Sequence, residues 1–190
     1  MIKKWFRRRE PPRLQVLMVC TANICRSPMA EGVLRAKLEQ AGLAGQVAVD
    51  SAGTQGFRRG GLADPRAVAQ AGKRGYRLEG LRSRPVDAAD FARFDLLLAM
   101  DRANLKALRD RCPAPAQPRL QLLLPFMADR ADAPRVAAAS SAPSPVDEVP
   151  DPYYGSVAGF DQALDLIEPA CDGLLRELRR RLAADRPNVD

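Results

Sequence analysis

Residues 14–28 read LQVLMVCTANICRSP and decide the fold of the chain. Residues 14–19 form a largely apolar run that is typical of a buried strand, and a helical pattern begins near Pro28. The loop between them, residues 20–27, separates Cys20 from Arg26 by five residues. A loop that carries a cysteine and an arginine between a strand and a helix N-terminus is suited to wrap an oxyanion.

The physical chemistry of this loop favours thiolate chemistry on phosphate. Inward-facing backbone N–H groups and the helix dipole attract an anion, and the same field favours the thiolate form of Cys20. Arg26 adds a planar fork that matches two phosphoryl oxygens. Ser27 could donate a hydrogen bond to the thiolate, and Asn23 tolerates the left-handed backbone of a tight loop. The cysteine and arginine taken alone are equally consistent with a buried structural thiol.

A nucleophile that attacks a phosphate ester also needs a proton donor for the leaving oxygen. The chain has no histidine, which excludes Cys-His and Ser-His arrangements. The leading candidate is Asp151 in VPDPYYG, residues 149–155, because flanking prolines stiffen the loop that presents this acid beside two tyrosines. The alternative is a proline-rich turn whose tyrosines pack on the core.

With these motifs the chain, from about residue 14 to 182, resembles the low-molecular-weight protein tyrosine phosphatase family. The family's Cys-x-Gly-Asn-x-Cys-Arg-Ser-Pro is met in residues 20–28 at every named position except Ala22. Its Asp-Pro-Tyr-Tyr-Gly is met completely by residues 151–155, and the segments 50–54 and 94–105 are similar to internal landmarks of the family. Two separated motifs in the right order form a specific signal.

The resemblance implies a two-step hydrolysis of phosphotyrosine esters through a phosphocysteine intermediate. Cys20 would be the nucleophile, Arg26 the phosphate clamp and Asp151 the general acid and base. No metal and no organic cofactor is implied. The resemblance also implies a phosphate-binding loop formed by Thr21, Ala22, Asn23, Ile24, Cys25 and Ser27, with Ser51 as a supporting hydroxyl. The walls of the substrate cleft would be Phe57, Tyr153 and Tyr154.

Two departures from the family pattern bear on this loop. Ala22 stands where the family has glycine, which requires that residue to keep a negative φ. Leu81 stands where the family commonly has a histidine that belongs to the hydrogen-bond network behind the loop, so we expect that network to be shorter or filled with water.

Related activities remain as alternatives. An arsenate reductase would need further cysteines, and residues 81–91 contain none. Protein-arginine phosphatases that resemble the same family tend to carry threonine at the position of Ile24. The isoleucine here therefore favours phosphotyrosine as the substrate. A non-catalytic phosphopeptide-binding module would need neither Cys20 nor Asp151.

The other cysteines carry separate expectations. Cys25 is a candidate redox partner that could trap oxidised Cys20 as a disulfide, or it could simply pack. Cys112 and Cys171 are expected to be ordinary buried or semi-buried thiols. Four cysteines in 190 residues without a recognisable signal peptide indicate a reducing compartment, and we expect a cytoplasmic protein.

The alternation of apolar runs and helical patterns predicts a single α/β domain. We expect a doubly wound, mostly parallel four-stranded sheet flanked by helices in flavodoxin-like order, with the catalytic loop at the carboxyl edge of the sheet. The expected strands are 14–20, 46–51, 96–100 and 120–124, and the expected helices are 28–41, 65–75, 102–111 and 157–182.

Three segments lie outside this phosphatase domain of residues 14–184 or interrupt it. Residues 1–13 form a basic arm that we expect to be flexible, with weak contact to an anionic membrane surface as the alternative. Residues 126–148 are a flexible insertion rich in Ala, Pro and Ser, and 185–190 a tail. No run is apolar enough to be a transmembrane segment.

The net charge of +7 does not by itself identify a partner. Dispersed arginines without a recognised motif argue against nucleic acid, whereas positive charge attracts phosphorylated substrates. The expected partner is a tyrosine-phosphorylated protein, and the resemblance suggests a tyrosine kinase of polysaccharide export.

Overall fold

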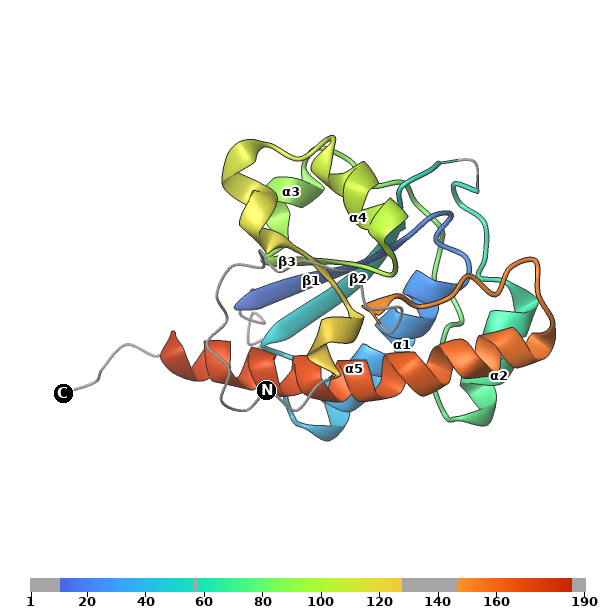
Figure 1. Cartoon of the computed structure of the whole chain (residues 1–190). Helices are drawn as coiled ribbons and strands as arrows, with labels where there is room; N and C mark the ends of the chain where they lie inside the picture. The colour runs from blue at the N-terminus through green and yellow to red at the C-terminus, as the bar shows by residue number, and fades with distance from the viewer. Residues whose placement is uncertain (1–10, 57, 128–146, 186–190) are drawn as a thin grey trace, which may run out of the picture.

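The computed structural model describes residues 11–56, 58–127 and 147–185, and its centre is a parallel sheet (Figure 1). The strands are β1 (Leu14–Cys20), β2 (Val47–Gly53), β3 (Leu96–Ala99) and β4 (Leu120–Leu122). They lie in the order β2-β1-β3-β4, and every neighbouring pair is parallel. The predicted doubly wound α/β sheet is confirmed.

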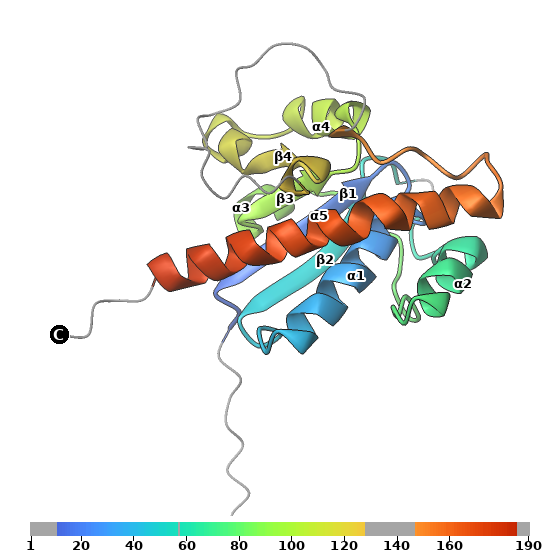
Figure 2. The ribbon, with the colours of Figure 1, turned by 60° about the horizontal axis from the view of Figure 1, so that its bottom comes forward.

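Helices cover both faces of this sheet (Figures 1 and 2). One face carries α1 (Arg26–Gln40) and α5 (Val157–Ala184), with α2 (Pro65–Lys73) packed beside them. The other face carries α3 (Asp90–Arg93) and α4 (Arg102–Arg109). Two 3₁₀ helices, η1 (Ala114–Arg119) and η2 (Leu124–Phe126), flank β4.

The side chains of β1 show why the sheet is covered twice. Successive residues of a strand point to opposite faces, and β1 is apolar on both. Val16 and Met18 pack in the core under α1 and α5, whereas Leu17 and Val19 pack in the core under α4. All four are fully buried, which explains a continuous apolar run in place of an alternating one.

The main elements agree closely with the sequence-based expectations. β1 has the predicted bounds, and the ends of the other three strands differ by one or two residues. The four predicted helices are present, although α1 begins two residues early, at Arg26. Sequence analysis did not predict α3, η1 and η2, which are too short for hydrophobic periodicity to detect.

Most of the expected flexible segments fall outside the described residues. This holds for residues 1–10 of the basic arm, 128–146 of the insertion and 186–190 of the tail. Phe57, which was expected in the wall of the substrate cleft, also lies outside the described residues. The expectations for these segments stay predictions. No helix among the described residues is long and apolar enough to cross a membrane.

The topology places the loop of residues 20–27 between two neighbouring strands whose connections leave on opposite faces of the sheet. β1 and β3 are neighbours, but β1 leads into α1 on one face and β3 leads into α4 on the other. Open α/β sheets bind ligands at the carboxyl ends of two neighbouring strands whose following connections leave on opposite faces of the sheet. Residues 20–27 follow β1 at this point.

Gly173 allows α5 to pack closely, which gives a first prediction. A Cβ at Gly173 would lie 1.7 Å from the carbonyl oxygen of Phe126 in η2, so Gly173→Ala must separate α5 from η2. We expect a loss of about 1–3 kcal/mol in the free energy of unfolding, measured by urea denaturation. Gly72→Ala is the matched control, because nothing lies within 4 Å of a Cβ there and alanine gains helix propensity. Equal stability of the two variants would contradict the prediction.

Candidate active site

The loop of residues 20–27 has the tight backbone that an anion-binding loop needs. Asn23 has φ of +55° and is the only non-glycine residue with a positive φ among the described residues. Ala22 keeps a negative φ, so its methyl group adds no backbone strain. The main chain after β2 holds the loop, because Thr54 N donates to Cys20 O at 2.9 Å and Gln55 N to Thr21 O at 2.9 Å.

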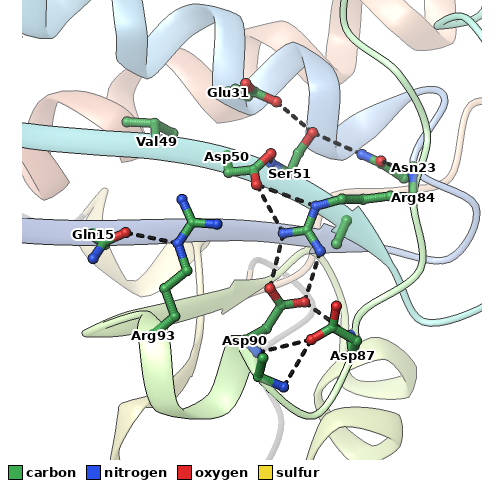
Figure 3. Close-up of polar contacts among 12 residues, drawn as sticks. Gln15, Asn23, Glu31, Val49, Asp50, Ser51, Arg84, Asp87, Asp90 and Arg93 are labelled. Carbon is green, nitrogen blue, oxygen red and sulfur yellow. Dashed lines mark hydrogen bonds and ion pairs between the residues drawn. The ribbon is translucent and has the colours of Figure 1, made fainter. Parts of the chain in front are cut away.

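Cys20 lies at the floor of this loop, 3% exposed, with two polar neighbours. Its Sγ is 3.0 Å from Ser27 Oγ and accepts a hydrogen bond of 3.3 Å from the main-chain N–H of Asn23. The side chain of Asn23 donates through Nδ2 to Ser27 Oγ at 2.9 Å and to Ser51 Oγ at 2.8 Å. Ser51 in turn donates to Glu31 Oε2 at 2.5 Å (Figure 3).

The direction of these bonds follows from the amide of Asn23. The main-chain N–H of Arg84 donates to Asn23 Oδ1 at 3.0 Å, so both protons of Nδ2 point toward the two serines. Ser27 Oγ therefore accepts from Asn23, and its own proton is free for Cys20, since the other acceptor, Ala52 O, lies 3.4 Å away. The network delivers a hydrogen-bond donor to the Cys20 sulfur.

Glu31 ends this network and was not predicted as a site residue. It is 1% exposed, and its Oε1 lies 2.5 Å from Arg35 Nη2, without the angle of a hydrogen bond. Burial raises the pKa of the Glu31 carboxyl above its ordinary value. The expectation that the network beside Leu81 is shorter or filled with water stays a prediction; in the structure Asn23 and Ser51 have Arg84 and Glu31 as protein partners.

Arg84 belongs to a second cluster that supports the loop from below. Its guanidinium donates to Asp50 Oδ2 at 2.9 Å and to Asp90 at 2.8 and 3.1 Å (Figure 3). Asp50 is on β2 beside Ser51, and Asp90 begins α3. The ion pairs fix the main chain of Arg84 at the point where it meets Asn23.

Arg26 is a buried cation at the other side of the loop, 2% exposed. Its Nη1 donates to Asp101 Oδ2 at 2.6 Å and to the carbonyl oxygen of Val149 at 3.0 Å. Its Nη2 donates to Asp151 Oδ2 at 2.7 Å and lies 3.4 Å from Thr21 Oγ1. One edge of the guanidinium is thus anchored in the protein, and the other meets the candidate acid.

Asp101 holds two parts of the site together. It is the N-cap of α4, where Oδ1 accepts from Asn104 N at 2.6 Å. When the amide of Asn104 is oriented to suit its neighbours, it donates to Asp101 at 3.1 Å and accepts from Thr21 Oγ1 at 3.1 Å. The carboxyl end of β3 is thereby tied to the loop after β1.

A cavity of about 430 Å³ opens above Cys20 and contains most of the predicted cleft. Tyr153 and Tyr154 meet edge to face, with ring centroids 4.9 Å apart. Arg58 also lines the cavity and donates to the Tyr153 hydroxyl at 3.1 Å. The full lining is Cys20, Thr21, Ala22, Ile24, Cys25, Arg26, Arg58, Asp151, Tyr153 and Tyr154.

The remaining cysteines are free, buried thiols. Burial, with nearby Asp64 adding to it, raises the pKa of Cys25 to about 12, so Cys25 is a protonated and weak nucleophile at neutral pH. Burial also raises the pKa values of Cys112 and Cys171. The redox role of Cys25 stays a prediction.

The structure brings the sequence-predicted residues together, apart from Phe57, which lies outside the described residues. Sequence reasoning missed Asp101, Glu31, Arg84 and Arg58. Asp101 could have been found, because it follows a strand at the same sheet edge as the cysteine loop. In the described part of the chain no group of His, Cys, Asp or Glu side chains is arranged to hold a metal ion.

Comparisons with known proteins point to one family. Residues 15–184 match the family model described as low molecular weight phosphotyrosine protein phosphatase. A low molecular weight protein-tyrosine-phosphatase of Streptomyces coelicolor is 42% identical, with 88% of this chain and 95% of that protein covered. A protein tyrosine phosphatase from Entamoeba histolytica, solved with Hepes in the active site, is 35% identical and has a TM-score of 0.76. The match covers 88% of this chain and 97% of that one. Vibrio vulnificus Wzb, solved in complex with benzylphosphonate, is 26% identical and has a TM-score of 0.70. The match covers 86% of this chain and 98% of that one.

The buried carboxyl of Glu31 predicts a pH-dependent stability. A raised pKa means that the folded state binds this proton more tightly than the unfolded state, whose ordinary value is 4.5. The stabilisation is present below pH 4.5 and is lost as pH rises toward the pKa of the folded state. Glu31→Gln removes this loss. In urea denaturation between pH 4.5 and about 7, the free energy of unfolding of the variant should therefore rise relative to that of the wild type as pH increases.

Glu39→Gln is the control for this prediction, because Glu39 is an exposed acid on the same helix. Its unfolding free energy should follow that of the wild type across the same range. A difference between Glu31→Gln and the wild type that does not change with pH would contradict the assignment.

Proposed function

Since the chain belongs to the low molecular weight phosphotyrosine protein phosphatase family, an enzyme family, we propose that it hydrolyses phosphotyrosine esters through a phosphocysteine intermediate. The observation that carries the proposal is the meeting of three groups in one cavity, namely the sulfur of Cys20, the guanidinium of Arg26 and the carboxylate of Asp151. Each has the chemistry that one part of phosphoryl transfer requires.

Cys20 is the proposed nucleophile. Its sulfur forms a bond to phosphorus while the bond from phosphorus to the phenolic oxygen breaks. The hydroxyl of Ser27, 3.0 Å away, stabilises the thiolate before attack and again when the sulfur leaves. Because the Asn23 amide already donates to Ser27, this donor is oriented in advance and costs little reorganisation during reaction.

Arg26 and the loop N–H groups hold the non-bridging phosphoryl oxygens. The anchored Nη1 keeps the plane of the guanidinium in place, and the Nη2 that contacts Asp151 can donate to phosphate. The N-terminus of α1 adds its positive dipole at the same point. These charges stabilise the transferring phosphoryl group as negative charge redistributes.

Asp151 is the proposed general acid and base. Its side chain is 47% exposed, which allows it to meet both a leaving group and water. The acid gives its proton to the phenolic oxygen in the first step. The resulting carboxylate takes a proton from the water that attacks phosphorus in the second step, releasing phosphate and the Cys20 thiolate.

The cleft supports an aromatic ester as the substrate. Tyr153 and Tyr154 provide apolar faces beside the phosphate loop, and the side chain of Ile24 adds bulk at its floor. Wzb of Vibrio vulnificus, whose solved complex contains benzylphosphonate, offers a related example of an aryl compound with a phosphonate group. Phosphoarginine and a purely binding role are the competing predictions.

The cell compartment and the partner are parts of the same proposal. Four free thiols suit a reducing compartment, and we place the protein in the cytoplasm on that ground. Its substrate is a tyrosine-phosphorylated protein. A tyrosine kinase of polysaccharide export as that protein rests on the family resemblance alone.

Steady-state kinetics with two aryl phosphates tests the proposed roles. Cys20→Ser should abolish turnover. Asp151→Asn should lower kcat for phenyl phosphate by about 10²- to 10⁴-fold, because the phenolate then leaves without a proton. The loss should be smaller for p-nitrophenyl phosphate, whose leaving group needs protonation less.

The control is Asp110→Asn, which removes an exposed carboxylate at the end of α4. It should leave both rates near those of the wild type. Equal losses of Asp151→Asn with the two esters would contradict the acid role. Faster turnover of phosphoarginine than of phosphotyrosine by the wild type would favour the competing activity, and a folded wild type that turns over neither would favour a binding module.

A further inference from the structure

One exposed arginine lines the cavity, and two more lie on the loops next to it. Arg58 lines the cavity and donates to the Tyr153 hydroxyl. Arg59 is the next residue of the same loop and is exposed. Arg82 is exposed on the neighbouring loop, which precedes Arg84.

The backbone joins these two loops at the rim of the cavity. Gly60 N donates to Ser83 O at 2.7 Å, and Ser83 N donates to Gly61 O at 2.8 Å. Leu62 and Arg82 form an antiparallel bridge beside them. The Ser83 hydroxyl donates to the carbonyl oxygen of Ala22 at 2.8 Å, and Ala22 lines the cavity. The loops that bear the three arginines are therefore anchored to the phosphate-binding loop.

Within the described part of the chain, these arginines differ from others nearby because no acidic side chain is paired with them. Arg66 is paired with Asp64, and Arg84 is paired with Asp50 and Asp90. No described carboxylate forms an ion pair with the three arginines of the rim, Arg58, Arg59 and Arg82. Their charge is available to a ligand in solution, and it lies at the mouth of a site for anionic groups.

One exposed apolar side chain lines this mouth, and two others lie on segments that continue from its lining. The large hydrophobic residues exposed in the described part of the chain are Leu62, Tyr154 and Val157. Leu62 follows the arginine loop, Tyr154 lines the cavity, and Val157 begins α5 just after the Tyr154 segment. A surface that combines apolar and basic groups around a catalytic mouth fits a polypeptide substrate better than a small ester.

We propose that this rim selects phosphotyrosine segments with acidic side chains next to the phosphotyrosine. The inference rests on the proposed function and adds a substrate class to it. Arg58, Arg59 and Arg82 bind the flanking carboxylates while Cys20 attacks the phosphate. Each exposed contact contributes about a 1.5- to 5-fold preference, and salt screens it.

Two matched phosphotyrosine peptides test the inference. One carries Glu on both sides of phosphotyrosine and the other carries Gln, so that shape is kept and only charge differs. The readout is the ratio of their kcat/KM values, Glu peptide over Gln peptide, at about 20 and 300 mM salt, where the Debye length falls from about 20 to 6 Å. We expect a wild-type ratio of about 5 to 20 at low salt that declines toward 1 at high salt.

Single substitutions Arg58→Gln, Arg59→Gln and Arg82→Gln should each lower this ratio, and the triple variant should bring it close to 1. Arg179→Gln is the control, because it removes the same charge from an exposed site about 33 Å along α5 from Val157. It should keep the wild-type ratio.

The outcomes separate the two proposals. Turnover of both peptides with a ratio near 1, or a ratio that falls equally in Arg179→Gln, overturns the acidic preference and leaves the proposed function intact. If the folded wild type hydrolyses neither of the two peptides nor phenyl phosphate, the proposed function is overturned, and this inference with it.

Discussion

The buried guanidinium of Arg26 is the constraint on which the arrangement of the site depends. A cation that is 2% exposed is costly unless it is paired and hydrogen-bonded. Asp101 from the end of β3, the carbonyl oxygen of Val149 and Asp151 all meet this one group. Two segments that are distant in sequence, the end of β3 and residues 149–151, therefore converge on the loop after β1, and the candidate acid comes beside the candidate nucleophile.

A second constraint acts on the opposite side of the loop through Asn23. Its left-handed backbone turns the loop, and its amide connects both serines with the main chain of Arg84. The ion pairs of Arg84 with Asp50 and Asp90 make that support rigid. The loop is held from both sides before any substrate binds, which is the condition for efficient electrostatic stabilisation.

The sequence predicted the fold well because its strongest signals are local. The run of residues 14–19 and the long periodic helices specify the sheet and its layers, and the loop motif locates the site on the sheet edge. Glu31 and Arg84 were missed for a different reason. Each looks like an ordinary polar residue in its segment, and each acquires a role only when tertiary packing buries it beside Asn23 or Ser51.

The charges of the molecule divide into two kinds according to their partners. Arg26 and Arg84 are buried or half-buried and neutralised by carboxylates, so they hold the main chain and contribute little field to the solvent. Arg58, Arg59 and Arg82 are exposed without such partners in the described chain, so their field reaches outward from the mouth of the cavity. The first group organises the reaction centre, whereas the second acts on what approaches it. Selection of the substrate can therefore be changed at the rim without disturbing the geometry at Cys20.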